Sequence, residues 1–444
     1  MSTKAVANFI TNTSFDRLPA DVVAQAKVAI RDHLGVLLAA HDNKAVAAAR
    51  KVAIAMGGRE ESTLIGTGIK VPCNLASLVN AVMTRTLDMD DGAYKTAGHL
   101  CHAGGVIVPS SIAVAECQNA TGKQFIEAVV VGYEVALRAG WIISLWPMFA
   151  PAGMCGTYGA AATTAKLLRL SPEETADALG IAEAHCLYPS RAKRFERMAM
   201  TKEAAGWGAM TGVTASLLAQ AGFNGPETLF DLSEYNQEPL ETLGKEWEIM
   251  GLYFKPYSSC RGTHAPLDGV FELIKQHNLT ADNISRITAR VGTNFAMSMA
   301  NYRPANIWEA QFSIPFVIGV AIADGEVGPL QIAENRLADD ALLSQVDKVK
   351  LVADPEVDSL ASNKGMRSCK IEVETKDGRE FETFVGYPKG APQNPLSEEE
   401  LIGKFRKLAT RTVGAERTED LVQCLAKLED IGNINKLVDK LSLL

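Results

Sequence analysis

The chain has little of what would assign it to a nucleic-acid-binding class of protein. Aromatic residues make up only 7% of its 444 residues, and the formal net charge of −8 leaves no basic excess. Neutralising phosphates needs a basic surface, so this balance argues against broad binding to nucleic acid. An anionic substrate would therefore need a locally basic pocket.

Signals for common cofactors and for membranes are also missing. The sequence has no GxGxxG or GxxxxGK[ST] loop for a nucleotide and no Cys-rich cluster for an iron–sulfur centre. No apolar run reaches the roughly 20 residues that span a bilayer, and residues 1–12 lack the sections of a signal peptide. We expect no organic cofactor, no catalytic metal and no membrane contact.

The cysteines lack the spacing of a disulfide framework or of a zinc ribbon. They stand singly at Cys73, Cys101, Cys117, Cys155, Cys186, Cys260, Cys369 and Cys424. Scattered cysteines favour free thiols in a reducing compartment. We therefore expect a cytoplasmic protein with free thiols.

Apolar residues are abundant and recur mainly at helical spacing. The chain is 47% hydrophobic and longer than one core usually grows, so two domains are expected. A helix is predicted after Pro19, with Asp21 placed to accept from the free amides of its first turn. Similar stretches are residues 44–56, 75–86, 106–119, 122–144, 157–168, 172–184 and 206–221. About the first 265 residues therefore look all-helical.

The pattern changes after residue 280. Residues 286–291 alternate polar and apolar side chains, and a second alternating run at 369–373 leads to Asp377-Gly378, a hairpin signal. Ser397 with Glu400 predicts a capped helix near the C-terminus. We predict a mainly α protein. Its parts are a large all-helical domain at 1–266, a smaller α+β domain at 267–395, and C-terminal helices at 396–444 that return to the helical domain.

The first polar cluster comprises residues 85–92, followed by His99 and His102. It holds Arg85, Asp88, Asp90 and Asp91 beside an apolar helix end. Such placement costs desolvation energy, and active sites commonly carry that cost. A capped helix end with a solvated loop is the alternative. A metal site built on the two histidines is weaker, because they fall in a glycine-bearing loop without the glutamate of zinc proteases.

Two further clusters can carry chemistry. Residues 191–203 place basic side chains before a Gly-rich helix start, which can bind carboxylates, and from these we select Arg194 and Lys202. Residues 255–264 end in His264 at the expected domain junction, where a cleft and a near-neutral pKa suit acid–base work. A structural histidine remains the alternative. Cys260 lacks an orienting third group, so a structural thiol is favoured over a nucleophile.

These three clusters, in this order, resemble the MmgE/PrpD family, which includes 2-methylcitrate dehydratase, cis-aconitate decarboxylase and iminodisuccinate epimerase. Residues 80–92 with His102 and residues 108–110 look like the family's "N…LDxDD…HP…P" segment. Later segments that resemble the family are residues 201–208, 257–264, 309–325 and 394–405. The resemblance therefore runs from the first helix to the last.

The resemblance implies a helical domain made from both ends of the chain, an inserted α+β lid, a homodimer and a site between the domains. Carried over residue by residue, it makes Asp88, Asp91, His102, Lys202 and His264 the catalytic candidates. The substrate-binding candidates are Arg85, Ala150, Arg194, Lys202 and Phe316. In this scheme Lys202 and Arg194 anchor carboxylates, the two histidines transfer protons, and Asp88 or Asp91 orients an imidazole or acts as base. The roles of acid and base are not divided between the histidines.

The chain also departs from the family pattern. Ala150 stands where much of the family has a histidine, and Phe316 stands where the decarboxylases carry a lid tyrosine. The His102 loop reads His-Ala-Gly and lacks the usual proline. Because decarboxylation depends on a correctly placed acid, these changes predict a poor cis-aconitate decarboxylase.

The family's reactions develop negative charge beside a carboxylate, which fixed cations and donors stabilise. The resemblance thus implies a cofactor-independent lyase that dehydrates a small hydroxy-polycarboxylate by proton abstraction next to a carboxylate. An epimerase acting on an amino- or imino-dicarboxylate is the alternative. A non-catalytic carboxylate-binding protein is a third hypothesis.

Overall fold

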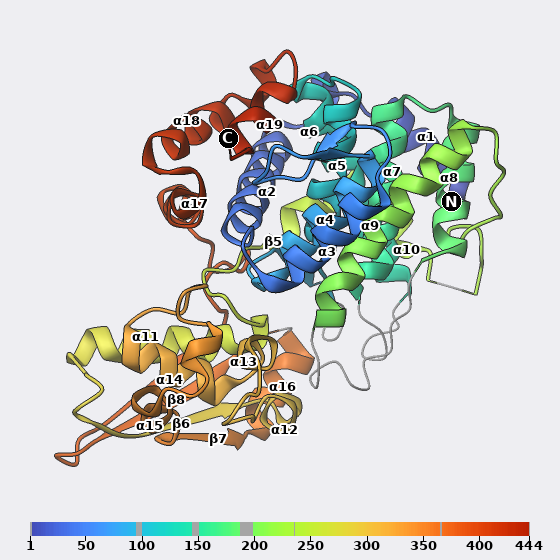
Figure 1. The fold of residues 1–444 in the computed structure, drawn as a ribbon. Helices are drawn as coiled ribbons and strands as arrows, with labels where there is room; N and C mark the ends of the chain where they lie inside the picture. Colours follow the sequence, from blue (N-terminus) through green and yellow to red (C-terminus); the bar gives the residue numbers. More distant parts are fainter. Residues whose placement is uncertain are drawn as a thin grey trace.

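The computed structural model describes the backbone of residues 2–94, 100–143, 151–186, 199–234, 236–364 and 366–443. The fold is mainly α, with a large helical part and a smaller part that contains a β-sheet (Figure 1). The predicted fold class is therefore confirmed.

Long helices build the N-terminal part, as the helical spacing predicted. Two predicted ranges, residues 44–56 and 172–184, coincide with observed helices. The other ranges differ at their ends by one to seven residues, most at the starts of α7 and α9. Near the start of the second helix, the carboxylate of Asp21 accepts from the amide of Val22 at 3.0 Å. The helices are α1 (Thr3–Asn12), α2 (Ala20–Ala39), α3 (Lys44–Met56), α4 (Cys73–Thr86), α5 (Gly104–Cys117), α6 (Gly122–Ile143), α7 (Pro151–Leu168), α8 (Pro172–Ala184), α9 (Ala199–Gln220) and α10 (Glu238–Glu241).

The C-terminal helices lie beside the first long helix. They are α17 (Glu398–Val413), α18 (Ala415–Ala426) and α19 (Asn435–Leu441), drawn in red against the blue α2 in Figure 1. Ser397 and Glu400 form the predicted capping box, because the Glu400 amide donates to Ser397 Oγ and the Ser397 amide donates to the Glu400 carboxylate. Phe405 of α17 is buried in the same hydrophobic cluster as Ile30 and Leu34 of α2.

The α+β part is built on a four-stranded sheet with strand order β7-β6-β8-β9. Strands β6 and β7 are parallel and the other pairs are antiparallel, so β8 and β9 form the predicted hairpin around Asp377-Gly378. Its strands are β6 (Ile284–Val291), β7 (Val349–Ala353), β8 (Cys369–Thr375) and β9 (Glu380–Val385). Its helices are α11 (His264–His277), α12 (Thr293–Ser298), α13 (Ile307–Gln311), α14 (Ile314–Asp324), α15 (Asp340–Val346) and α16 (Pro355–Lys364).

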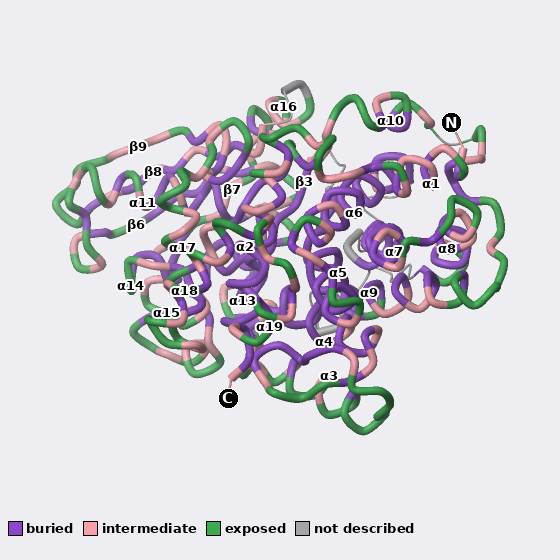
Figure 2. The backbone as a smooth tube through the Cα atoms, turned by 90° about the horizontal axis from the view of Figure 1, so that it is seen from above, coloured by how far each residue is buried: buried purple, intermediate pink, exposed green. Residues whose placement is uncertain are grey.

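Burial along the sheet follows the alternation read from the sequence. Cys369, Ile371 and Val373 of β8 are buried, and the residues between them are partly exposed. The edge strand β9 is mostly exposed or partly exposed, as Figure 2 shows. Helix α11 packs against β8 and β9, so it covers one face of the sheet.

The prediction that the first 265 residues are all-helical is wrong in detail. The described part of that range contains five short strands: β1 (Ser62–Thr63), β2 (Lys70–Val71), β3 (Gly92–Tyr94), β4 (Leu100–Cys101) and β5 (Leu252–Tyr253). Strands β4, β3 and β5 form a small antiparallel sheet. Strands of two or three residues are too short to show a period in the sequence.

The expectation of free thiols is also wrong for one pair. Cys101 of β4 and Cys155 of α7 are joined by a disulfide, although 54 residues separate them in sequence. Among the described residues, the other six cysteines are not part of this disulfide. Only the folded chain brings β4 against α7, so the spacing of the cysteines could not show this pair. Among the described residues, no helix combines the length and apolar character needed to cross a bilayer.

Two large clusters of buried apolar residues follow the two parts of the chain. One combines residues between 22 and 254 with residues between 405 and 441, and the other lies between residues 265 and 385. The domain limits at residues 266 and 395 stay a prediction, and the first of them falls inside α11, whose Ala265 already belongs to the second cluster. We call the second part the lid.

The chain crosses between the two parts twice, and the two crossings are hydrogen-bonded to each other. The amide of Phe254 donates to the carbonyl of Gly390 at 3.0 Å. Gly390 has a φ of 85°, and a side chain there would collide with the Phe254 carbonyl. A glycine is therefore required where the crossings meet.

Candidate active site

The loop after α4 carries the first polar cluster and is held by the segment before α11. Asp88 has a φ of 52°, in the left-handed region that residues other than glycine seldom adopt. Lys255 Nζ donates to Asp88 Oδ1 at 2.6 Å and to the Asp88 carbonyl at 3.0 Å. Ser258 Oγ donates to the Leu87 carbonyl at 2.7 Å. Residues about 170 positions away in sequence thus hold this loop in a strained conformation. Backbone strain of this kind is common at functional sites.

Lys255 is fully buried, and its charge is paired with carboxylates. Besides Asp88, it lies 4.0 Å from Asp90 Oδ1. A buried ammonium is costly unless it is paired. The sequence placed Lys255 in the third cluster but gave no reason to select it over the other basic residues, because its burial is visible only in the fold.

Asp90 is paired with two cations. It accepts a hydrogen bond from Arg85 Nη1, and both side chains are almost completely buried. Burial alone would raise the pKa of Asp90, but the charges of Arg85 and Lys255 outweigh it and hold the pKa well below its ordinary value. Asp90 is therefore a carboxylate at neutral pH.

His102 is held in one tautomer beside this carboxylate. Its Nδ1 lies 2.8 Å from the Asp91 carbonyl and 3.5 Å from Asp90 Oδ2. Because a carbonyl only accepts, Nδ1 carries the proton and Nε2 keeps its lone pair. Burial, followed by the charge of Arg85, lowers the pKa of His102. The ring is therefore neutral at neutral pH, as a proton acceptor must be.

Asp91 contacts side chains of α2 and α6. Tyr133 Oη donates to Asp91 Oδ2 at 2.6 Å, and His33 Nε2 lies 3.5 Å from Asp91 Oδ1. Burial opposes a charge on His33, but the Asp91 carboxylate outweighs it and raises the pKa to about 9. Any side chain at position 104 would collide with Tyr133, His33 and Asp91, which explains the glycine two residues after His102.

His264 begins α11 and is completely buried. Arg261 Nη1 donates to its Nδ1 at 3.2 Å, so Nε2 carries the proton and donates to the Ser259 carbonyl at 3.2 Å. Burial, then the charges of Arg261 and Lys255, holds the pKa of His264 well below its ordinary value. His264 is thus a neutral ring with both nitrogens engaged.

Arg261 connects His264 with the His102 side of the site. Its guanidinium lies 4.6 Å from the centre of the Tyr253 ring, and that ring meets the His102 ring edge-on at 6.2 Å. Arg261 also donates to the carbonyls of Lys389 and Pro388 at 2.8 and 3.0 Å. We call the connected set the polar cluster: Arg85, Asp88, Asp90, Asp91, His102, Tyr253, Lys255, Arg261 and His264.

The structure thus brings together five of the residues predicted from the sequence: Arg85, Asp88, Asp91, His102 and His264. Sequence reasoning missed the roles of Tyr253, Lys255 and Arg261, and also His33 and Tyr133 behind Asp91. His33 follows Arg31 and Asp32 within α2, and a run of polar residues inside this otherwise apolar helix was the available signal.

The remaining predicted site residues are not tested by this geometry. Ala150, Arg194 and His99 lie outside the described residues, and Lys202 lies in the first turn of α9 with its side chain outside the description. Phe316 is buried in the hydrophobic core of the lid and not in the polar cluster. Its contact with substrate stays a prediction. Cys260 packs against the lid core, which fits a structural thiol.

Two cavities elsewhere are lined by lysines whose ammonium groups already have partners. A cavity of about 410 Å³ between α17 and the lid includes Lys404 and Lys407. Lys404 Nζ lies 2.7 Å from Asp32 Oδ1, and Lys407 pairs with Glu326. Neither lysine therefore offers an unpaired charge to a bound carboxylate.

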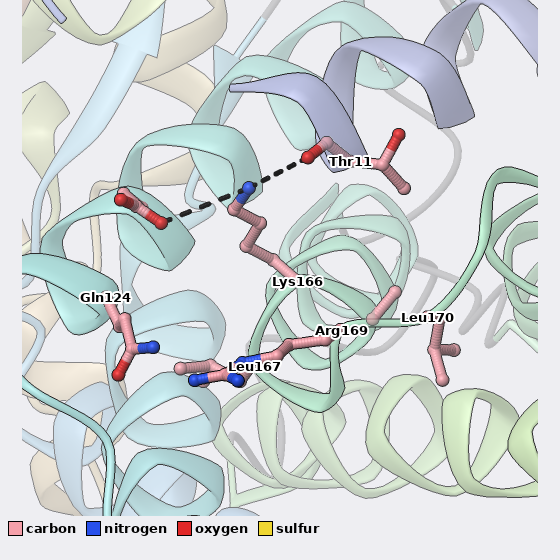
Figure 3. A pocket seen from close by; sticks show the side chains of 8 residues that line it. Thr11, Gln124, Lys166, Leu167, Arg169 and Leu170 are labelled. Carbon is pink, nitrogen blue, oxygen red and sulfur yellow. Dashed lines mark hydrogen bonds and ion pairs between the residues drawn. The ribbon is translucent and has the colours of Figure 1, made fainter. Parts of the chain in front are cut away.

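The other cavity, of about 290 Å³, lies between α6 and α7 near the end of α1. Figure 3 shows Lys166 extending toward Thr11, whose carbonyl accepts from Nζ at 3.1 Å. Lys166 also donates to the Thr13 carbonyl. Because Lys166 thereby binds backbone carbonyls at the end of α1, its role is structural.

The fold and the polar cluster define a two-part, mainly helical protein whose buried charges and imidazoles gather where the lid joins the helical part. The chain belongs to the MmgE/PrpD family. The model of the MmgE/PrpD N-terminal domain matches residues 4–236, and that of the MmgE/PrpD C-terminal domain matches residues 257–427.

Curated relatives align over nearly the whole chain. The cis-aconitate decarboxylase-like protein oryM of Aspergillus oryzae is 28% identical over 99% of this chain and 97% of its own length. The cis-aconitate decarboxylase of Homo sapiens is 26% identical over 98% of this chain and 93% of its own. The cis-aconitate decarboxylase of Mus musculus is 25% identical over 98% of this chain and 92% of its own length.

Proposed function

We propose that the protein is a lyase that abstracts a proton next to a carboxylate of a small hydroxy-polycarboxylate and releases water. The observation that carries this proposal is the state of His102: a neutral ring whose Nδ1–H is fixed on the Asp91 carbonyl, leaving the Nε2 lone pair for a substrate proton. A positioned base of this kind typically accelerates proton transfer about 10²- to 10⁴-fold.

Arg261 is the described cation best suited to bind a substrate carboxylate. Its hydrogen bonds to protein go to two carbonyls and to His264, so it forms no direct ion pair with a carboxylate of the described residues. Its buried Nε has no hydrogen-bond partner among the described residues. An arginine so placed can stabilise the negative charge that develops on a carboxylate as the neighbouring carbon loses its proton.

The remaining roles follow from the partners of each group. Asp91 binds Tyr133 and supports the His102 loop through its own carbonyl, which suits a positioning residue. Asp88 and Asp90 hold Lys255 and Arg85. Carboxylate anchoring by Lys202 and Arg194, and substrate contacts of Ala150 and Phe316, remain parts of the proposal that rest on the family resemblance.

Decarboxylation is a second candidate, because the curated relatives named above are cis-aconitate decarboxylases or similar to them. It also begins beside a carboxylate and ends with protonation of carbon. Ala150 and Phe316 argue against it, since each lacks a polar group that the family resemblance leads us to expect there. Epimerisation of an amino- or imino-dicarboxylate is the remaining alternative. In that reaction a proton must be added to the opposite face of the carbon that lost one.

One enzyme preparation tests all three reactions. We expect a hydroxy-polycarboxylate such as 2-methylcitrate to give an unsaturated product, detected by near-ultraviolet absorbance, faster than cis-aconitate releases carbon dioxide. Faster carbon dioxide release would establish decarboxylation instead. Solvent deuterium entering an amino-dicarboxylate without a double bond would establish epimerisation. Binding without any exchange or turnover would favour a carboxylate-binding protein.

We also propose a cytoplasmic homodimer that acts on a small di- or tricarboxylate and binds neither nucleic acid nor membrane. The net charge of −8 supports the lack of nucleic-acid binding. Light scattering of the purified protein measures the oligomeric state, and a monomeric mass would contradict the dimer.

A further inference from the structure

A second group of reactive side chains lies outside the polar cluster. Glu61, Cys73 and Cys117 each offer one ligand atom, and these atoms lie within 4.8 Å of one another. Among the described residues, no other set of three or more histidine, cysteine or acidic side chains comes this close. Cys117 lies at the end of α5 and Cys73 at the start of α4, so the group joins two helices and a loop.

We propose that Glu61, Cys73 and Cys117 form a binding site for a thiophilic divalent cation such as Zn²⁺. Two thiolates and one carboxylate are ligands that zinc accepts, and a water molecule would complete its usual four-coordination. With zinc–sulfur bonds of about 2.3 Å, two sulfurs in a tetrahedral site lie about 3.8 Å apart. The observed spacing of the ligand atoms therefore needs only a small contraction.

The surroundings hold the three ligands in place. The Glu61 carboxylate accepts from the amide of Cys73 at 3.1 Å, which ties the loop to the first turn of α4. Cys73 is buried, whereas Glu61 and Cys117 are partly exposed. The site is thus anchored on one side and open on the other, where a metal and its water can enter.

Neighbouring charged groups are engaged with each other and do not compete for the metal. Glu116, next to Cys117, accepts from the amide and the hydroxyl of Thr63 and pairs with Lys70 at 2.9 Å. Gln118 donates weakly to Cys117 Sγ at 3.6 Å. An amide donor near a thiolate is the kind of outer contact that orients a metal ligand.

The site is separate from the proposed chemistry. Cys73 begins α4, and the loop of Asp88 to Asp91 follows the end of the same helix. A 14-residue helix is about 21 Å long, so a bound metal would not reach the polar cluster. We infer a stabilising metal that clamps α4, α5 and the loop of Glu61. Binding would release the two thiol protons to solvent, so affinity falls at low pH.

Cobalt titration of the full chain tests the site. The chain is reduced, stripped of metal by a chelator and titrated with Co²⁺, which reports tetrahedral thiolate ligation through its visible and charge-transfer absorption. We expect one Co²⁺ per chain, displaced by Zn²⁺, and a melting temperature that rises when Zn²⁺ is added. Cys117→Ser and Cys73→Ser should abolish the spectrum, and Glu61→Gln should weaken binding by roughly tenfold or more.

The matched controls are Glu60→Gln, an exposed neighbouring carboxylate, and Cys424→Ser, a free cysteine on α18. Both should bind Co²⁺ as the unmodified chain does. Because Cys117 is partly exposed, its serine variant should fold even if the buried Cys73→Ser variant does not. No stoichiometric binding by the reduced chain, or a thiolate spectrum that survives in Cys117→Ser, would overturn the proposal.

Discussion

Lys255 Nζ donates to both the side chain and the backbone carbonyl of Asp88, 167 residues away in sequence. This pair holds a non-glycine residue in a left-handed conformation at the centre of the polar cluster. The lid's connecting segment and the loop after α4 therefore depend on each other for their shape.

Replacing Lys255 by methionine should destabilise the protein strongly. Removing one partner of a buried ion pair leaves an uncompensated charge and typically costs about 3–5 kcal/mol. Lys407→Met is the control, because its pair with Glu326 is largely exposed and such pairs contribute about 0–1 kcal/mol. Urea unfolding of both variants measures the difference. Equal stabilities would mean that Asp88 does not need Lys255.

His102→Asn should lower kcat about 10²- to 10⁴-fold without unfolding the protein. Because burial and Arg85 lower the pKa of His102, the acidic limb of the kcat/KM profile should lie below pH 6.5, with activity lost as the pH falls through it. His277→Asn, at the far end of α11, is the control and should keep full activity. An acidic limb above pH 6.5 would contradict the role of His102 as base.

Because of the His33–Asp91 pair, the free energy of unfolding should decrease as the pH rises into the alkaline range. The pKa of His33 is raised by Asp91 from 6.5 to about 9, so its contribution is complete below pH 6.5 and is lost as the pH rises to about 9. A shift of this size corresponds to roughly 3 kcal/mol. Urea unfolding from pH 6 to 9.5 measures it. The difference between the unmodified chain and His33→Gln should shrink over this range, and a constant difference would contradict a charged His33.

Arg261→Gln should raise KM for the carboxylate substrate. A hydrogen bond to a charged group contributes about 1.5–3 kcal/mol, so a roughly tenfold to hundredfold effect is expected. Arg286→Gln, which removes an exposed pair with Glu374 on the lid sheet, is the control. Steady-state kinetics with far-ultraviolet dichroism separates binding from folding. A change in kcat alone would assign Arg261 to positioning His264 rather than to the substrate.

Exhaustive chelation should leave activity intact while lowering thermal stability. The polar cluster is proposed to work without a metal, whereas Glu61, Cys73 and Cys117 are proposed to bind one for stability. Activity and melting temperature are measured on the same chelated sample. If chelation abolished activity and one specific metal restored it, the hypothesis of a catalytic metal would be supported instead.

Regular elements were readable from the sequence because their signals are local. Ser397 and Glu400 are three residues apart, and the spacing that predicts α8 lies within the helix itself. The family resemblance then selected Asp88, His102 and His264, which the structure brings together. What stayed hidden depends on distant contacts: the burial of Lys255, the stacking of Arg261 on Tyr253, and the disulfide between Cys101 and Cys155.

Small strands and buried partners were missed for related reasons. Strands β3, β4 and β5 have too few residues for a period, and the pairing of β3 with β5 joins segments about 160 residues apart. His33 and Tyr133 look like ordinary members of their helices until Asp91 is placed between them. Helices can be predicted from local sequence patterns, but the roles of the polar side chains depend on tertiary contacts.

The hydrogen bond between Phe254 and Gly390 joins the two chain crossings at one point, about which a rotation of the lid would pivot. Arg261 is bonded to the carbonyls of Pro388 and Lys389, directly beside this pivot. A rotation of the lid would therefore displace Arg261 and His264 only slightly, because they lie near the rotation axis. The outer edge of the sheet would be displaced much further. Opening for substrate and preserving the alignment of the charged groups are thus compatible in one motion.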